Sequence, residues 1–132
     1  MSTPVVTAKE VADISRERGF LAKQLYVVFT TPTNGMGPVM ANLKSHLDYQ
    51  ESLEKNGTMF AAGPHWTDDE QHWDGEGMVV VRASSMAEAE AIAAADPMHK
   101  SGARSYRVRP WLVNEGTLTV KLDFATGRFA LD

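Results

Sequence analysis

The sequence contains no cysteine among its 132 residues. This absence excludes disulfide bonds, thiolate nucleophiles and cysteine metal sites, and it fits a reducing compartment. Apolar runs are short, and none approaches the roughly 20 residues that a membrane-spanning helix needs. Basic residues are few as well: 13 lysines and arginines against 17 acidic residues leave a formal net charge of −4, with no basic run. We therefore expect a cytoplasmic protein with neither a membrane nor a nucleic-acid partner.

Several motifs of cofactor-dependent and nucleophilic enzymes are also absent. The chain has no P-loop, no glycine-rich dinucleotide fingerprint, no Gly-x-Ser-x-Gly elbow and no His-Glu-x-x-His. These absences argue against a nucleotide-dependent enzyme or a serine hydrolase, and we expect no cofactor and no metal.

The apolar pattern predicts one α+β domain over residues 1–132. Its core, residues 25–113, has predicted strands at 25–30, 58–62, 78–81 and 105–113 and predicted helices at 39–55 and 86–95. The order strand, helix, strand, strand, helix, strand predicts a ferredoxin-like split βαβ (βαββαβ) fold, an antiparallel sheet with both helices on one face. A second copy would cover the bare face and form a dimeric α+β barrel, so we expect a homodimer.

Both ends extend this core. The N-terminal extension, residues 1–24, contains a predicted helix at 7–22. In the C-terminal extension, residues 114–132, apolar residues alternate with polar ones from Leu118 to Phe124, which predicts a half-buried strand. We consider the hypothesis that this strand extends the sheet or crosses to the partner.

Four local patterns set boundaries within the core. Gly63-Pro64 is expected to end the second strand, and Asn56-Gly57 to end the first helix. Ser85 and Glu88 have the spacing of a capping box, and Pro97 is expected to end the second helix. Pro110 cannot donate a ladder hydrogen bond, so the last strand is predicted to lie at an edge or to be bulged.

His46 is the first candidate for chemistry. At 100° per residue it lies about 60–80° from the centre of the predicted apolar stripe of Met40, Leu43 and Leu47, at the edge of the buried face. A histidine there can act as general acid or base near neutral pH. The alternative is a boundary histidine that only makes structural hydrogen bonds.

Asp96 is the second candidate. It stands at the C-terminal end of the second predicted helix, where the negative end of the helix dipole disfavours a carboxylate. A carboxylate retained there is expected to have a cationic or donor partner elsewhere in the fold. The alternative is that Asp96 caps amides near Gly102 in an Asp-Pro turn.

The segment from His65 to Gly75 contains two His-Trp pairs, His65-Trp66 and His72-Trp73, with acidic residues between them. The tryptophans are expected to pack over a pocket or at an interface, or to anchor the loop to its own sheet. The histidines and acids permit a divalent metal site, although a solvated acidic loop explains the same composition. Trp66 and His65 are candidates for binding a substrate.

Two further candidates flank the last strand. Arg107 shares a strand face with Arg109, opposite Tyr106 and Val108, and could bind an anionic group, unless the face is simply solvated. Ser101 follows Asp96 closely and could line the same site.

Taken together, these residues resemble the YciI-related family from about Leu25 to Val113. The resemblance rests on His46-Leu47, on Gly57 followed by Ala62-Gly63-Pro64, and on Ala95-Asp96-Pro97 followed by Gly102. Members resemble ferredoxin-like domains paired into dimeric α+β barrels. An arginine is common three residues before the family's histidine, but Leu43 stands there, so an anion contact is expected to have moved.

The resemblance implies a histidine–aspartate pair at His46 and Asp96, in which Asp96 holds one tautomer of the imidazole and His46 moves a proton. It implies a cofactor-independent lyase or isomerase, similar to a dehydrochlorinase or a lactone isomerase, that acts on a small cyclic or aromatic-derived compound. The alternative is a non-catalytic small-ligand-binding or accessory protein of the same fold. A third possibility is a metal-dependent enzyme that uses the His65–His72 segment.

Overall fold

A computed structural model describes residues 5–132 of the chain, which divides into two compact units. One unit covers Gln24–Leu112 and contains the predicted ferredoxin-like core. The other consists of the two terminal segments, up to Lys23 and from Val113 onward. No helix in the described residues is both long and apolar enough to cross a bilayer.

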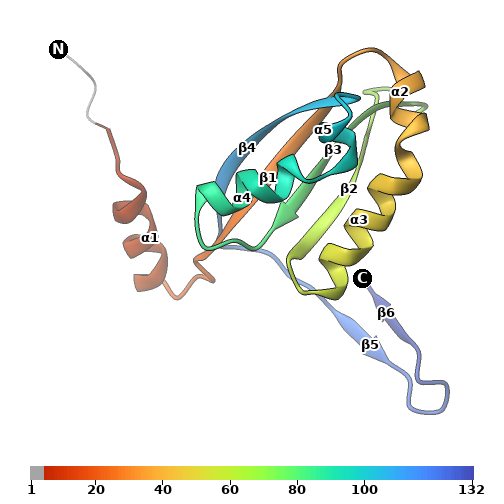
Figure 1. The fold of residues 1–132 in the computed structure, drawn as a ribbon. Coiled ribbons are helices and arrows are strands. Elements are labelled where there is room, and N and C mark those ends of the chain that lie inside the picture. Colours follow the sequence, from red (N-terminus) through yellow and green to blue (C-terminus); the bar gives the residue numbers. More distant parts are fainter. Residues whose placement is uncertain (1–4) are drawn as a thin grey trace. The chain divides into compact units, whose positions relative to one another are not determined.

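A four-stranded antiparallel sheet forms the centre of the larger unit (Figure 1). Its strands are β1 (Lys23–Pro32), β2 (Met59–Trp66), β3 (Trp73–Val81) and β4 (Arg104–Val113), in the spatial order β2-β3-β1-β4. This is the order of a split βαβ fold, so the predicted fold class is confirmed. β4 is an edge strand, as Pro110 predicted.

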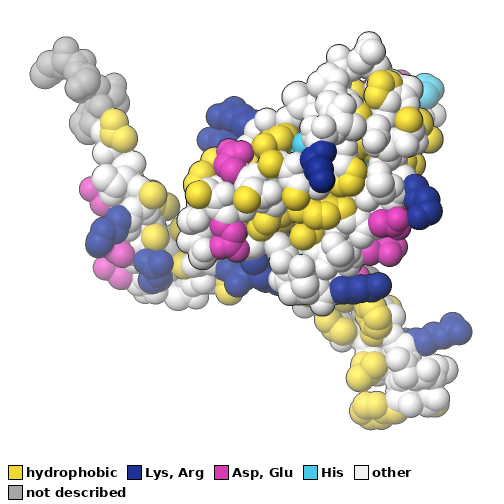
Figure 2. Space-filling view, viewed as in Figure 1, with side chains coloured by type: hydrophobic (Ala, Val, Ile, Leu, Met, Phe, Trp, Pro, Cys, Tyr) yellow, Lys and Arg dark blue, Asp and Glu magenta, His cyan; other side chains and the backbone are white. Residues whose placement is uncertain are grey.

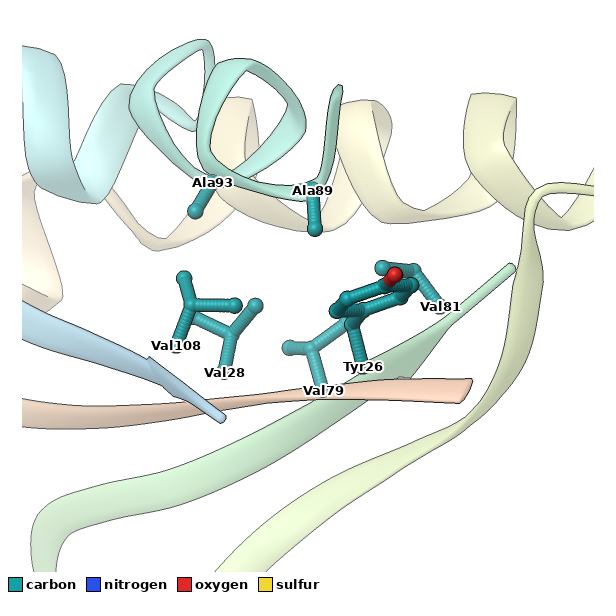
Figure 3. Close-up of a cluster of buried hydrophobic side chains, with 7 residues drawn as sticks. All are labelled: Tyr26, Val28, Val79, Val81, Ala89, Ala93 and Val108. Atoms are coloured by element: carbon teal, nitrogen blue, oxygen red, sulfur yellow. The ribbon is translucent and has the colours of Figure 1, made fainter. Parts of the chain in front are cut away.

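Four helices accompany the sheet: α2 (Met36–Ala41), α3 (Leu43–Lys55), α4 (Met86–Ala94) and α5 (Pro97–Lys100). α3 and α4 lie on the same face of the sheet, where the hydroxyl of Tyr49 on α3 donates to the carbonyl of Ile92 on α4 over 2.7 Å (Figures 1 and 3). Hydrophobic side chains gather between these two helices, and charged side chains lie around them (Figure 2). The prediction of both helices on one face is therefore confirmed.

The core lies between α4 and the sheet (Figure 3). The buried residues that α4 contributes are the alanines Ala89 and Ala93, so the helix can lie close to the strands, with Ile92 packed against the cluster. The strands contribute Tyr26, Val28, Val79, Val81 and Val108, which alternate along β1, β3 and β4 as period-two geometry requires.

The first predicted helix is broken in two. Asn42 separates α2 from α3, with φ −105° and ψ 4°, and its side-chain amide donates to the Pro38 carbonyl over 2.8 Å. The predicted loop at 31–38 is also too long, because α2 begins at Met36. Pro38 is tolerated as the third residue of α2, since the first turn of a helix needs no backbone donors.

β2 and β3 are longer than predicted, because Gly63-Pro64 does not end β2. Pro64 pairs with Gly77, and the ladder continues, with a bulge, to Trp66 opposite Trp73. A proline is tolerated there because β2 is an edge strand. The strands approach so closely that a Cβ on Gly77 would lie 2.9 Å from the Gly63 carbonyl oxygen. Only Thr67 to His72 remain outside the two strands.

The second predicted helix ends as α4 at Ala94, and its capping differs in one detail from the prediction. The hydroxyl of Ser85 accepts from the backbone N–H of Glu88 over 3.1 Å, as expected. The Glu88 carboxylate instead accepts from the backbone N–H and the hydroxyl of Ser84. The bond from Glu88 to the Ser85 hydroxyl thus forms as in a capping box, but the return bond to the Glu88 carboxylate comes from Ser84, one residue earlier.

The terminal segments form their own secondary structure. α1 (Ala8–Glu17) is a helix whose capping box joins Thr7 and Glu10. The predicted strand from Leu118 to Phe124 is shorter: β5 (Val120–Leu122) pairs with β6 (Phe129–Leu131) in a separate two-stranded sheet. It therefore does not extend the four-stranded sheet. The reason is local, since Gly127 takes φ +67° and turns the chain back onto itself.

The alanines of α4 provide a test of this packing. We expect Ala89→Leu to lower the free energy of unfolding by about 1–3 kcal/mol, because a fully buried alanine against the sheet leaves no room for a larger side chain. Ala91→Leu, at an exposed position of the same helix, is the matched control and should change it by less than about 0.5 kcal/mol. Urea denaturation measures both, and equal effects would contradict the packing described.

Candidate functional site

His46 lies on the buried face of α3, with 6% of its surface exposed. The buried positions along α2 and α3 are Val39, His46 and Leu53. The predicted stripe is therefore wrong as a core face: Met40 is 55% exposed and Leu47 is 47% exposed. The buried positions still recur every seven residues, but the buried face includes Val39 and His46 in place of their neighbours Met40 and Leu47.

Asp96 does not end a helix but begins one. α4 stops at Ala94, and Asp96 is the N-cap residue of α5, with Pro97 at the first helical position. The Asp96 carboxylate accepts from the backbone N–H of Met98 over 2.9 Å. The prediction of an unfavourable helix C-terminus is therefore wrong, because an aspartate is among the best N-cap residues. A capping role near Gly102 is also wrong, since the amide bound is that of Met98.

The two residues meet inside the fold. Nδ1 of His46 lies 2.9 Å from Oδ1 and 2.8 Å from Oδ2 of Asp96, and both side chains are buried. An ionised carboxylate only accepts hydrogen bonds, so Nδ1 carries the hydrogen and Nε2 is left as the second functional nitrogen. Within the described residues, Nε2 makes no hydrogen bond to the protein.

A pocket of about 400 Å³ opens beside His46. Its apolar wall comes from α3, β2 and β3: Leu43, Leu47, Pro64, Trp66 and Trp73. Its polar groups are Thr30, His46, Gln50, Glu76 and Arg104. A mostly apolar pocket with a few polar groups is the usual form of a small-molecule site.

The other predicted site residues divide into two groups. Trp66 lines the pocket, as does Trp73, whose indole N–H donates to the Glu76 carbonyl over 2.9 Å. His65, Ser101 and Arg107 do not line it. Ser101 instead connects α5 to β4: its hydroxyl donates to Met98 and accepts from the Ala103 N–H, both over 3.3 Å.

Arg104 is a pocket residue that the sequence prediction did not select. Its side chain lies on the helix-facing side of β4, and only 6% of its surface is exposed. The guanidinium lies over the Trp73 ring, 5.8 Å from its centroid. Burial lowers the pKa of Arg104, and the negative charge of Asp96 acts in the opposite direction. Period two could have indicated this position, since Arg104 shares a strand face with Tyr106 and Val108.

His99 lies beside the His46–Asp96 pair as a neutral histidine. Its Nδ1 donates to the Ala93 carbonyl over 2.7 Å, so its Nε2, 2.9 Å from Oγ1 of Thr30, accepts from that hydroxyl. Burial lowers the pKa of His99, and the Ala93 bond and the charge of Asp96 only partly oppose this. One histidine near the pocket is therefore neutral and structural, while the other lines the pocket and has a nitrogen without a hydrogen bond within the described residues.

No group of three or more His, Asp or Glu side chains in the described residues is placed to hold a metal ion. His65 lies on β2, whereas His72 precedes β3 in the turn that joins the two strands. Asp69 accepts from the Thr67 hydroxyl over 2.6 Å and from the Gln71 N–H over 3.0 Å, so it caps this turn.

Comparison with known proteins assigns a family. The YCII-related domain matches residues 24–112, and the chain belongs to this family. Among solved structures it is similar to 5-chloro-2-hydroxyhydroquinone dehydrochlorinase from Burkholderia phenoliruptrix AC1100, in complex with 2,5-dihydroxybenzoquinone. The TM-score is 0.54 at 22% identity, over 66% of this chain and 92% of that chain, which supports the fold. No curated protein has a significantly similar sequence.

The neutral state of His99 predicts a pH dependence of stability. Its folded pKa is below the unfolded value of 6.5, so the unfolded chain takes up the proton first. We expect the contribution of His99 to the free energy of unfolding to be constant above about pH 6.5 and to fall as the pH drops towards its lowered folded pKa.

Urea denaturation between pH 7.5 and roughly pH 5 measures this change, a range chosen around the ordinary histidine pKa. The loss should be smaller in His99→Gln than in the wild type. His72→Gln, at an exposed histidine of the turn, is the control and should keep the wild-type slope. An equal slope in all three proteins would contradict the neutral assignment.

Proposed function

We propose that this protein is a cofactor-independent lyase or isomerase that moves a proton on a small cyclic or aromatic-derived compound. The observation that carries this proposal is the arrangement of His46. Its Nδ1 is held by the Asp96 carboxylate, while the residue lines a pocket with its second nitrogen unused. In this proposal Asp96 orients the ring and stabilises the imidazolium, and His46 exchanges the proton through Nε2.

The proton balance of both reaction classes fits one base. In an elimination, Nε2 takes a proton from carbon, the C–H electron pair forms the new double bond, and the leaving group departs with its bonding pair. In an isomerisation, the imidazolium returns the same proton to another carbon of the conjugated system. Neither reaction requires an oxidant or a second substrate, because a conjugated carbonyl or phenol on the substrate holds the developing charge.

The pocket walls support a planar ring as substrate. Trp66 and Trp73 offer flat aromatic surfaces, and Leu43 and Leu47 enclose the space beside His46. A related fold binds a dihydroxybenzoquinone, which is a compound of this shape. We therefore propose Trp66 as a substrate-binding residue. The alternative of a non-catalytic binding protein was expected to place His46 and Asp96 out of hydrogen-bond reach, and their atoms are 2.8 Å apart.

Substitution of the pair tests the proposal. With 5-chloro-2-hydroxyhydroquinone and a panel of muconolactones as trial substrates, we expect His46→Gln to lower kcat by about 10²- to 10⁴-fold, since the proton acceptor is lost. Asp96→Asn should also lower kcat, because an amide can place the imidazole in the wrong tautomer. Chloride release and absorbance changes measure turnover.

The control for these variants is His72→Gln, which should retain wild-type turnover. Circular dichroism and a thermal melt establish that each variant is folded. Full turnover by a folded His46→Gln or Asp96→Asn protein would contradict the proposed roles.

We also propose that the protein is a homodimer formed through the sheet face opposite the helices. Val28 and Val79 contact α4, so Phe29 and Met78, the next residues along β1 and β3, point to the opposite face, where they pair across the strands. Phe29 is 40% exposed and Met78 is 38% exposed. A second copy of the same face would cover these apolar side chains.

Light scattering coupled to gel filtration tests the dimer. We expect the mass of two chains for the wild type and a shift towards one chain for Phe29→Asp, because the interface would then bury an unpaired charge. Met86→Asp introduces the same charge at a methionine on α4 that is 38% exposed, and should leave the dimer unchanged. A monomeric wild type, or equal effects of both variants, would contradict this interface.

A further inference from the structure

Arg104 is a buried cation for which the described residues 5–132 offer no hydrogen-bonding partner. Its Nε is fully buried and makes no hydrogen bond. Within the described residues the guanidinium takes part in no ion pair, and its contact with Trp73 is with the face of the ring. Because guanidinium has five N–H donors and remains charged in proteins, burying it unpaired is costly.

The surroundings of Arg104 do not remove this cost. Asp96, the carboxylate whose charge most affects it, already accepts from His46 and from the Met98 N–H. Glu76 lines the same pocket but forms no ion pair with Arg104. The pocket is therefore the side from which a partner for the guanidinium can come.

His46 and Arg104 line the same pocket, and both are close enough to His99 to affect its pKa. The proposed proton carrier and the unpaired cation therefore lie around one small volume. A ligand that fills it can present a carbon or oxygen to Nε2 of His46 and an anionic group to the guanidinium. Trp73 would hold the plane of the guanidinium while leaving its edge free for the anion.

We propose that Arg104 binds an oxyanion of the substrate, which is a planar ring compound with a carboxylate or an ionised ring oxygen. This inference rests on the proposed function for the identity of the pocket as a substrate site. It adds the charge of the substrate and its orientation, with the anionic oxygen at Arg104 and the carbon to be deprotonated at His46. Charge developing on that oxygen during proton removal would also be stabilised by the guanidinium.

Two matched pairs of probes distinguish the sources of the anion. Benzoate and benzamide differ in the charge of a carboxyl-type group, and 2,5-dihydroxybenzoquinone and 2,5-dimethoxybenzoquinone differ in ionisable ring oxygens. We expect the anionic member of at least one pair to bind the wild type more tightly than its neutral analogue. Which pair shows this preference identifies the oxyanion as carboxylate or ring oxygen, and calorimetric titration measures all four affinities.

Variants then assign the preference to Arg104. We expect Arg104→Met to weaken binding of the preferred anion by about tenfold to a hundredfold, the value of a hydrogen bond to a charged group, and to leave its neutral analogue unchanged. Arg104→Lys should recover part of the affinity, since it restores the charge but not the planar donors. Arg109→Met, an exposed arginine of the same strand, is the matched control.

A second measurement needs no variant. The Nε–H of a buried arginine can be followed by ¹⁵N NMR, and the Arg104 signal, identified by its absence from Arg104→Lys, should shift when the preferred anion is added to the wild type. The proposal is overturned if neither anion is preferred, if Arg104→Met weakens the anion and its neutral analogue equally, or if the signal does not move.

Failure of this inference can be told apart from failure of the proposed function. His46→Gln should lose turnover yet keep the Arg104-dependent preference for the anion. Anion binding without turnover by the wild type would support Arg104 and contradict the acid–base proposal. Turnover that depends on His46 but not on Arg104 would do the reverse.

Discussion

The hydrogen bonds between the imidazole of His46 and the carboxylate of Asp96 join segments that are 50 residues apart. His46 comes from α3, which follows β1, and Asp96 opens α5, which leads into β4. The pair thus connects the two halves of the split βαβ fold on the helix-covered side of the sheet. Because both side chains are buried, neither can be removed without leaving a polar group of the other unsatisfied.

Asp96 can serve this pair because its backbone is held by something else. Pro97 and the N-cap bond to Met98 begin a helix of four residues, and Met98 is itself fully buried against Val39 and Ala103. α5 is therefore held between α2 and the start of β4. The carboxylate that orients His46 is fixed by the packing of its neighbours, which is the support that a precise site requires.

Titratable groups in contrasting environments lie in the pocket and beside it. Burial keeps His99 neutral although its bond to the Ala93 carbonyl acts against this, while His46 is bonded to a carboxylate through one nitrogen only. Arg104 adds a fixed positive charge, and its Nε has no partner in the part of the chain that the structure describes. A proton acceptor beside an uncompensated cation is suited to a ligand that becomes or remains negative as it loses a proton.

Much of the fold could be predicted from local patterns. The order of strands and helices, the edge position of β4 and the cap at Ser85 all follow from periodicity and from the chemistry of proline and serine. The errors arose where tertiary contacts override those patterns. Gly63-Pro64 continues a strand because β2 lies at an edge, and the packing of α2 and α3 buries Val39 and His46 in place of Met40 and Leu47.

The sequence by itself determined the α+β class, the family and the choice of His46 and Asp96 as candidates, because these depend on residue order and spacing. Tertiary structure decided their geometry: which nitrogen of His46 meets Asp96, and that Asp96 begins a helix. It also decided that Arg104, rather than Arg107, lies at the pocket. Whether a side chain is buried and hydrogen-bonded depends on segments that are distant in the chain. The sequence of one strand could therefore place Arg104 on a face of the sheet. It could not show that the Nε of Arg104 is buried at the pocket with no hydrogen-bonding partner among the described residues.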